Sequence, residues 1–302
     1  MNTTLALAER NALWFNLHNP PLALPAPVAV KQPRGIALLT GGRRHGEVTR
    51  LASPSDLGEM IKPFVFLDHT LVAPRAEPLF GIHPHSGIAT LTTVLSGAIH
   101  YEDSTGKSGV VPTGGVEWMK AGGGVWHDGG PTKDGPVRAF QLWVALQASE
   151  ENAPAVSEYV APEEIEREGP ARVILGRYGA AKSAIRSAPG GINYLHVTLK
   201  DGQRWKYTPP AIHHVAWLAI DTGSLRSVRA IDAGQIAVFE ESNEPIELEA
   251  RGDTSVVLGT AIKHPYPLVL GNYSVHTSRA ALEKGEAEIV RIGRRLQAEG
   301  RI

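Results

Sequence analysis

The chain has 302 residues, long enough for two domains with hydrophobic cores of their own. Its formal net charge of −1 argues against nucleic acid and anionic membranes as partners, because both need a basic surface. The absence of Cys excludes disulfides and thiolate metal ligands, and 32 Gly with 22 Pro indicate short strands joined by turns.

Residues 1–34 are predicted to form a Pro-rich extension. Five prolines, Pro20, Pro21, Pro25, Pro27 and Pro33, disfavour regular helix and favour an extended segment. Glu9 and Arg10 interrupt the only apolar run near this end, so no signal peptide is expected. No window of the chain approaches about 18 uninterrupted apolar residues, so we expect no membrane span and a cytoplasmic location.

Residues 35–148 are predicted to form a first domain of antiparallel strands. The strand candidates are rich in Val, Leu, Ile and Thr: Ile88–Leu95, Ile99–Tyr101, Val116–Met119 and Arg138–Leu146. Turn signals separate them, at Ser96-Gly97 and at the polar corner Glu102–Gly106. Hairpins with little helix favour a small jelly-roll barrel of the cupin type, which places ligands in its interior or mouth.

Residues 149–170 are predicted to be a solvated linker, because glutamates are frequent there. Residues 171–270 repeat the rhythm of the first domain. Strands are expected at Ile192–Leu199, Val215–Ile220, Ile236–Glu240 and Ser255–Leu258, with a turn at Asp221–Ser224.

The second domain is expected to lack a metal site. When the two halves are overlaid on their glycines, Pro209 and Ala211 occupy the places of two histidines of the first half. His213 and His214 are adjacent, and neighbouring strand residues point to opposite faces. Residues 271–302 are then predicted to be a return segment and a closing helix with Ile289, Ile292 and Leu296 at helical spacing.

Three histidines of the first domain form a candidate metal site. His83 and His85 are two residues apart, so in a strand their imidazoles leave the same face, and His127 would complete a set of three. Neutral imidazoles suit iron, nickel, copper or zinc better than magnesium or calcium. The alternative is that these rings bond only to each other or to water in a pocket without metal.

The segments HPHSG, LSGAIHYEDSTGKSG and GGVEWMKAGGGVWHD resemble motifs of the pirin family. That family reads roughly HPHRG, LxGxxxHxDSxGxxG and GxVxWMxAGxGxxHxE. The resemblance implies an all-β fold of two tandem cupin barrels, with a C-terminal helix that returns to the first domain. The family's fourth metal ligand, a Glu, falls on Gly129 here, and a further family Glu falls on Ala89.

The resemblance implies a metal-dependent dioxygenase of the quercetin 2,3-dioxygenase type that acts on a chelating aromatic substrate. Fe(II) is the first expectation for the metal, followed by Ni, Cu or Zn. With Gly129 in place of the family Glu, the reaction needs another general base, for which Asp128 and then Glu117 are the candidates, or three imidazoles suffice because the substrate itself chelates the metal. The alternative implied by the family is a non-enzymatic protein that binds a protein partner, with a regulatory or degraded metal site.

Overall fold

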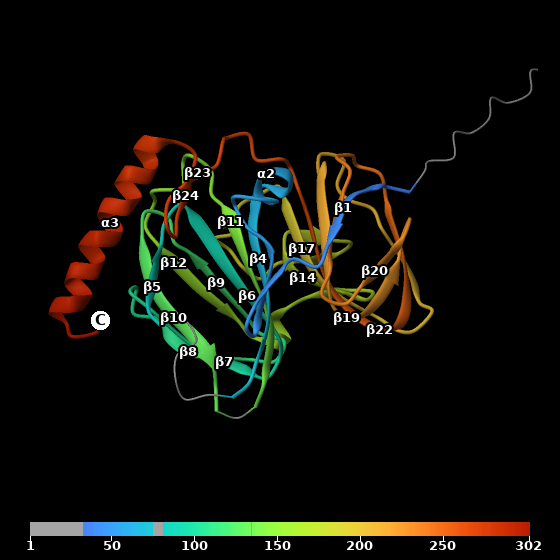
Figure 1. Ribbon diagram of the computed structural model, residues 1–302, viewed down its shortest axis with the longest axis horizontal. Coiled ribbons are helices and arrows are strands. Elements are labelled where there is room, and N and C mark those ends of the chain that lie inside the picture. Colours follow the sequence, from blue (N-terminus) through green and yellow to red (C-terminus); the bar gives the residue numbers. More distant parts are fainter. Residues whose placement is uncertain (1–32, 75–80, 134) are drawn as a thin grey trace, which may run out of the picture. The chain divides into compact units, whose positions relative to one another are not determined.

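The computed structural model describes residues 33–74, 81–133 and 135–302. The predicted Pro-rich extension therefore lies outside the described residues, apart from its last two positions. The fold is all-β, with two tandem cupin barrels followed by a C-terminal helix (Figure 1). This confirms the predicted fold class.

Two sheets build the first barrel. One has seven strands in the order β12-β9-β6-β11-β4-β3-β2, and the other has four in the order β5-β10-β7-β8. A short helix, α2 (Gly58–Ile61), precedes β4. The strands are β2 (Arg43–His45), β3 (Val48–Ala52), β4 (Phe64–Val72), β5 (His83–His85), β6 (Ile88–Ser96), β7 (Ala98–Asp103), β8 (Ser108–Pro112), β9 (Val116–Lys120), β10 (Val125–Pro131), β11 (Val137–Ala145) and β12 (Val156–Val160).

A nine-stranded sheet forms most of the second barrel, with the main order β1-β21-β19-β22-β17-β14-β13. Its strands are β1 (Ile36–Thr40), β13 (Arg167–Glu168), β14 (Ala171–Leu175), β17 (Ile192–Leu199), β18 (Arg204–Tyr207), β19 (Val215–Arg226), β20 (Ala230–Asp232), β21 (Ile236–Phe239) and β22 (Ile246–Ala261). A small separate pair consists of β15 (Arg177–Tyr178) and β16 (Ala181–Lys182). Although β1 falls inside the range predicted for the first domain, it pairs with β21, because Ile36 and Leu39 pack on the core of the second barrel.

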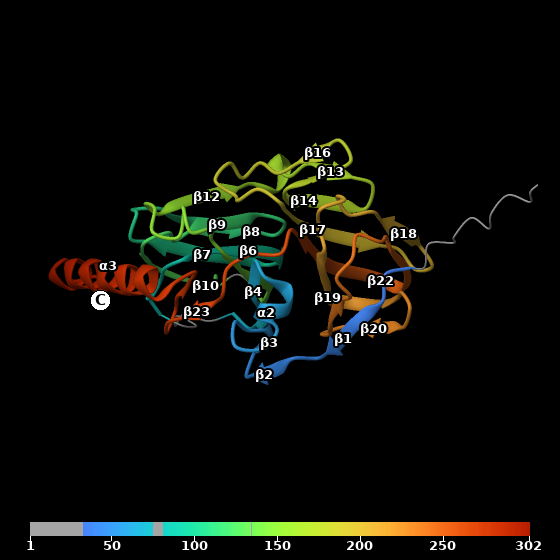
Figure 2. The same ribbon diagram turned by 90° about the horizontal axis from the view of Figure 1, so that it is seen from above.

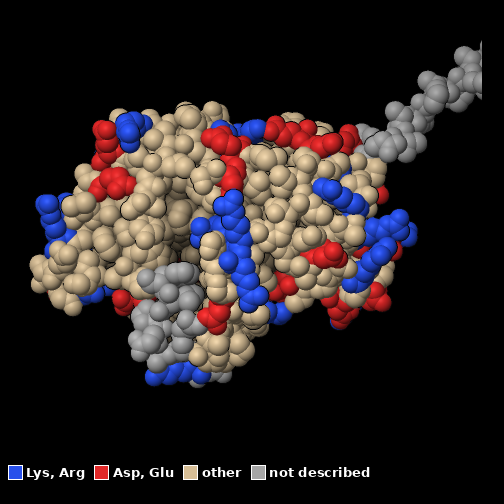
Figure 3. Space-filling model, viewed as in Figure 1, with Lys and Arg blue, Asp and Glu red and all other residues tan. Residues whose placement is uncertain are grey.

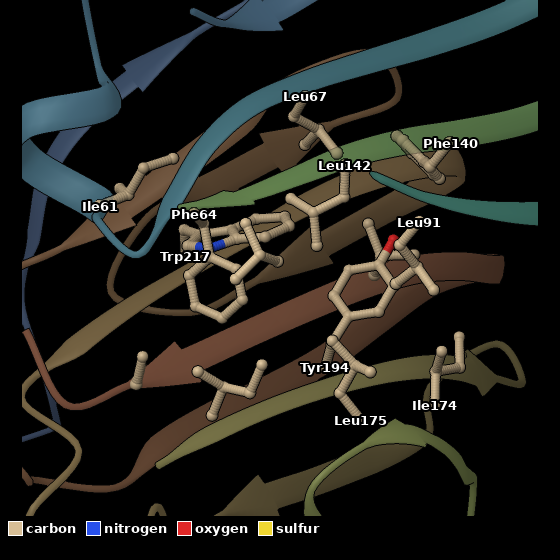
Figure 4. Close-up of a cluster of buried hydrophobic side chains, with 14 of the residues drawn as sticks. Ile61, Phe64, Leu67, Leu91, Phe140, Leu142, Ile174, Leu175, Tyr194 and Trp217 are labelled. Carbon is tan, nitrogen blue, oxygen red and sulfur yellow. The ribbon is translucent and has the colours of Figure 1, made fainter. Parts of the chain in front are cut away.

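A single hydrophobic cluster joins the two barrels. Phe64 of β4 meets Trp217 of β19 edge to face, with ring centroids 5.4 Å apart, and both side chains are fully buried. Figure 4 shows this cluster, in which Leu91 and Leu142 of the first barrel lie near Tyr194 of the second. The barrels therefore share a core and do not merely touch through a wet interface.

The predicted turn at Asp221–Ser224 is wrong. These residues lie inside β19, where the pairing with β22 shifts register between Ile220 and Ser224. Gly223 has a φ of 76°, which Gly adopts without steric cost, so the strand bends through a bulge and continues. The chain turns only after Arg226.

The predicted linker is also more ordered than its acidic composition indicates. β12 pairs antiparallel with β9 and so extends the first barrel, and a 3-10 turn at Pro162–Glu164 follows it. Glu151 is 3% exposed, because His276 and Thr277 bond to its carboxylate. Composition alone indicates solvation, whereas tertiary hydrogen bonds bury this one carboxylate.

The C-terminal segment returns to the first barrel, as the fold prediction states. β23 (Val269–Leu270) pairs with β24 (Val275–His276), and Ser274 forms a parallel bridge with Ser86. Helix α3 (Arg279–Ala298) begins at Ser278, whose side chain accepts the Ala281 amide, and lies beside β10 and β24 (Figures 1 and 2). Its buried face contains the three predicted residues, Ile289, Ile292 and Leu296.

Basic and acidic side chains are interspersed on the face seen in Figure 3, with one row of Lys and Arg running down its middle. Among the described residues, no helix is both long and apolar enough to cross a membrane.

Candidate metal centre

His83, His85 and His127 converge inside the first barrel. β5 and β10 run antiparallel, and their register places His127 directly opposite His83, so both side chains leave the same face. The ring centroids of His83 and His127 lie 4.5 Å apart, and each lies 5.0 Å from that of His85. One ligand nitrogen from each ring lies within 4.8 Å of the other two. The structure therefore brings the three predicted ligands together.

Backbone carbonyls orient two of these rings. His83 Nδ1 lies 2.8 Å from the Gly81 oxygen, and His85 Nδ1 lies 2.9 Å from the Tyr273 oxygen. Because a carbonyl oxygen only accepts, Nδ1 of each ring carries a proton, and Nε2 is the nitrogen of each ring that is left for a metal. This is the arrangement in which an imidazole binds a metal through Nε2 while an outer partner fixes its tautomer.

The donor set fits a transition metal. The Nε2 atoms of His85 and His127 are buried and have no hydrogen-bond partner among the described residues, an arrangement that is costly unless a ligand takes them up. Burial and the neighbouring His83 lower the pKa of His85 to about 3. Burial likewise lowers the pKa of His127 well below its usual value, and the two neighbouring imidazoles lower it further. The imidazoles of His85 and His127 are therefore neutral and able to ligate at neutral pH.

A pocket adjoins the histidines, and Glu117 lines it together with His83 and His127. Glu117 is 6% exposed, and its side-chain oxygen accepts a hydrogen bond from the Thr92 hydroxyl at 3.3 Å. Burial, reinforced by Asp103, raises its pKa to about 7 against the lowering by Thr92. Apolar side chains form much of the remaining wall: Val72, Ile99, Pro131, Val137 and Ala139.

Asp128 and Gly129 follow His127 on β10. Asp128 pairs with Glu102 of β7, and its neighbour His127 points into the barrel, so the Asp128 side chain leaves the opposite face. Its carboxylate accepts the Gly129 amide at 2.9 Å. Gly129 itself lines the pocket and contributes no side chain to it.

Two contacts of the centre were not predicted from the sequence. Trp143 lies edge to face against His85 with centroids 4.8 Å apart, and the Tyr273 carbonyl bonds that same ring. Trp143 carried no motif signal. Tyr273 lies in the GNYSVHT segment, whose resemblance to the family's return segment was the available signal.

The comparisons with known proteins agree with this architecture. The model of the pirin family matches residues 45–144. A pirin-like protein from Caulobacter vibrioides is 31% identical over 211 residues, which cover 66% of this chain and 75% of that protein.

Two solved structures are similar to the fold. A quercetin 2,3-dioxygenase from Acinetobacter baumannii has a TM-score of 0.77 at 24% identity, covering 86% of this chain and 98% of its own. The bacterial pirin YhhW from Escherichia coli in complex with nickel(II) has a TM-score of 0.59 at 18% identity, covering 76% of this chain and 96% of its own.

Two jelly-roll barrels with three converging imidazoles in the first define a bicupin with a candidate metal centre. Taken with the sequence match to its relatives, the chain belongs to the pirin family.

Proposed function

We propose that this chain is a metal-dependent oxygenase of the quercetin 2,3-dioxygenase type, acting on a chelating aromatic substrate. The observation that carries the proposal is the convergence of His83 with the buried His85 and His127, whose ligand atoms all lie within 4.8 Å of one another beside a pocket. The similar structure of a quercetin 2,3-dioxygenase supports the reaction type, and the nickel complex of a bacterial pirin supports a transition metal. Fe(II) is the metal we propose.

The three imidazoles would hold the metal without a protein carboxylate, because the motif resemblance aligns Gly129 with the family's Glu and Gly129 adds no side chain to the pocket wall. A bound ion would draw electron density from the substrate oxygens and prepare the aromatic system for reaction with dioxygen. Neutral ligands leave the charge of a divalent ion uncompensated by the protein. A substrate that chelates through deprotonated oxygens supplies that compensation, which favours an acidic hydroxyl next to a carbonyl.

Glu117 is the base that we assign to this reaction. Its pKa of about 7 lets the carboxyl take a proton from a substrate hydroxyl at neutral pH and return it later. It lines the same pocket as His83 and His127, whereas Asp128 lies on the other face of β10. The apolar walls at Val72 and Val137 exclude water from an aromatic ring held there.

Metal content and oxygen consumption test the proposal. The purified chain is analysed for metal, stripped, and reloaded separately with Fe(II), Ni(II), Cu(II) and Zn(II), and oxygen uptake is followed with quercetin. We expect one equivalent of metal per protein and oxygen uptake that depends on quercetin. His127→Ala should abolish this oxygen uptake. His214→Ala is the matched control, because that imidazole is exposed in the second barrel. A wild-type chain that binds none of these ions would refute the proposal and favour a protein-binding role.

The role of Glu117 is tested separately in the metal-loaded chain. Glu117→Gln keeps the shape of the side chain and removes its basicity, so we expect kcat to fall by about 100-fold or more. Metal content is expected to stay at the wild-type level. Asp128→Asn is the paired variant and should retain most activity, and a larger loss in Asp128→Asn than in Glu117→Gln would reverse the assignment.

A further inference from the structure

A buried polar chain lies directly behind the metal-binding strand. Ser86 Oγ lies 2.9 Å from His276 Nε2, and His276 Nδ1 lies 3.1 Å from Glu151 Oε2. The three residues are 0%, 2% and 3% exposed, and they come from three distant parts of the sequence. Ser86 directly follows the ligand His85 in the sequence. The hydrogen-bonded set, called the Ser86–His276–Glu151 chain below, therefore adjoins the metal centre.

The order of serine, histidine and carboxylate is one that activates a nucleophile in hydrolases, but here the hydroxyl is covered. Gly285 of α3 packs so closely that a Cβ on it would lie 2.6 Å from both Ser86 Oγ and His276 Nε2. A Cβ on Gly87 would lie 2.8 Å from the His276 ring. No substrate reaches Ser86 Oγ when it is enclosed in this way, so the Ser86–His276–Glu151 chain has a positioning role.

The Ser86–His276–Glu151 chain holds the C-terminal return in place, and we define this return as residues 269–277. Ser86 Oγ lies 2.9 Å from Ser274 Oγ, and the Val275 amide donates to the Ser86 carbonyl at 3.3 Å. Glu151 accepts both the amide and the hydroxyl of Thr277, each at 2.6 Å. The return is therefore held at its sixth and seventh residues by Ser86 and at its ninth by charge-assisted bonds to the Glu151 carboxylate.

The return in turn carries the carbonyl that orients His85. Tyr273 directly precedes the bonded Ser274, and its oxygen lies 2.9 Å from His85 Nδ1. A displacement of the return by one ångström would break this bond and release the ring to exchange its tautomer.

We propose that the Ser86–His276–Glu151 chain is a positioning device for the metal centre, acting through the return and the Tyr273 carbonyl to keep the His85 proton on Nδ1. The inference rests on the proposed metal-binding function, because it names the part of the fold that prepares one ligand for the ion. The Ser86–His276–Glu151 chain holds the C-terminal return beside the His85 ring. Residues near the end of the sequence therefore orient a candidate metal ligand that lies about 190 positions earlier. Outer partners of this kind change metal affinity by about 10- to 100-fold.

The first test needs no metal. Nitrogen-15 NMR of the imidazoles in the stripped full-length chain reports which nitrogen of each ring carries the proton. We expect His85 in the wild type as a single Nδ1–H tautomer, and a mixture of tautomers in Ser86→Ala and in His276→Asn. A His85 that keeps the single Nδ1–H form in both variants would overturn the inference.

The second test measures Ni(II) binding by calorimetry. His276→Asn is expected to bind Ni(II) about 10- to 100-fold more weakly than the wild type. Thr260→Ala is the matched control, because it breaks a similar buried chain in the second barrel, where Thr260 Oγ1 bonds His213 Nδ1 at 3.0 Å and the Tyr207 hydroxyl at 2.9 Å. It should lower the melting temperature and leave Ni(II) affinity unchanged.

The outcomes separate the two proposals. Equal Ni(II) affinity in His276→Asn and the wild type counts against the positioning device. A wild type that keeps the single His85 tautomer yet binds none of the four ions would instead refute the proposed function. Should His276→Asn fail to fold, Thr277→Val removes one hydroxyl from the same carboxylate, and an intermediate loss of Ni(II) affinity is expected.

Discussion

His69 Nε2 of the first barrel lies 3.0 Å from Asp221 Oδ1 of the second. The Asp221 side chain is 1% exposed, and Arg138 approaches its other oxygen at 3.5 Å. Asp221 falls within the register shift of β19, so the residue that contacts the first barrel belongs to the bulge found in place of the predicted turn.

Asp221→Asn is expected to lower the free energy of unfolding by about 3 kcal/mol, because it leaves the groups around a buried carboxylate without their partner. Urea unfolding followed by tryptophan fluorescence measures the change. Asp253→Asn is the control: its ion pair with Lys200 has side chains 64% and 82% exposed, so solvent screens the pair and the change there should be much smaller. Equal losses of stability in Asp221→Asn and Asp253→Asn would contradict the stabilising role given to the buried Asp221 contacts.

Gly293→Ala is expected to destabilise the chain by about 1 kcal/mol or more. At an open helical position this change stabilises by up to about 1 kcal/mol, but here a Cβ would lie 2.9 Å from the Trp126 ring. That ring cannot move away freely, because its indole N–H donates to the Ile289 carbonyl at 2.9 Å. Thermal unfolding checks the sign. Val290→Ala, on the exposed face of α3, is the neutral comparison.

Glu117 gives stability a defined pH dependence. Burial raises its pKa from 4.5 to about 7, so the folded chain holds a proton that the unfolded chain releases. The stability from this protonated carboxyl is complete below pH 4.5 and is lost as the pH rises through 7. As the pH rises from 4.5 to 7, the free energy of unfolding of the metal-free wild type should fall by about 3 kcal/mol relative to that of metal-free Glu117→Gln, because Gln does not titrate. Urea unfolding at several pH values measures this, and Glu163→Gln, at an exposed site, should show no such trend.

Gly129→Glu is expected to raise metal affinity, because it adds a charged ligand group to the pocket wall beside His127. One charge-assisted contact contributes about 1.5–3 kcal/mol, which is roughly a ten- to hundredfold gain in affinity. The site has room: a Cβ at Gly129 meets only the His100 carbonyl, at 3.3 Å. Calorimetric titration with Ni(II) is the measurement. An unchanged affinity would mean that a side chain at position 129 does not reach the ion.

The candidate site was largely predictable because its signals are local. The i and i+2 spacing of His83 and His85 fixes a common face in any strand, and the motif resemblance supplies His127. Strand positions such as Ile192–Leu199 were predicted from β-branched and apolar composition, and the structure has the same bounds.

The remaining features depend on contacts between distant residues. The burial of Glu151 comes from His276 and Thr277, more than 120 positions away, and no local pattern encodes it. Asp221–Ser224 has turn composition, but pairing with β22 keeps the segment extended. Local propensity yields to tertiary pairing in both cases.

The core that both barrels share has a practical consequence for dissection of the protein. A gene divided near residue 170 would yield two fragments, one with Phe64 and the other with Trp217 exposed to water. We expect each fragment alone to aggregate, and the two to recover a native assembly when they are produced together.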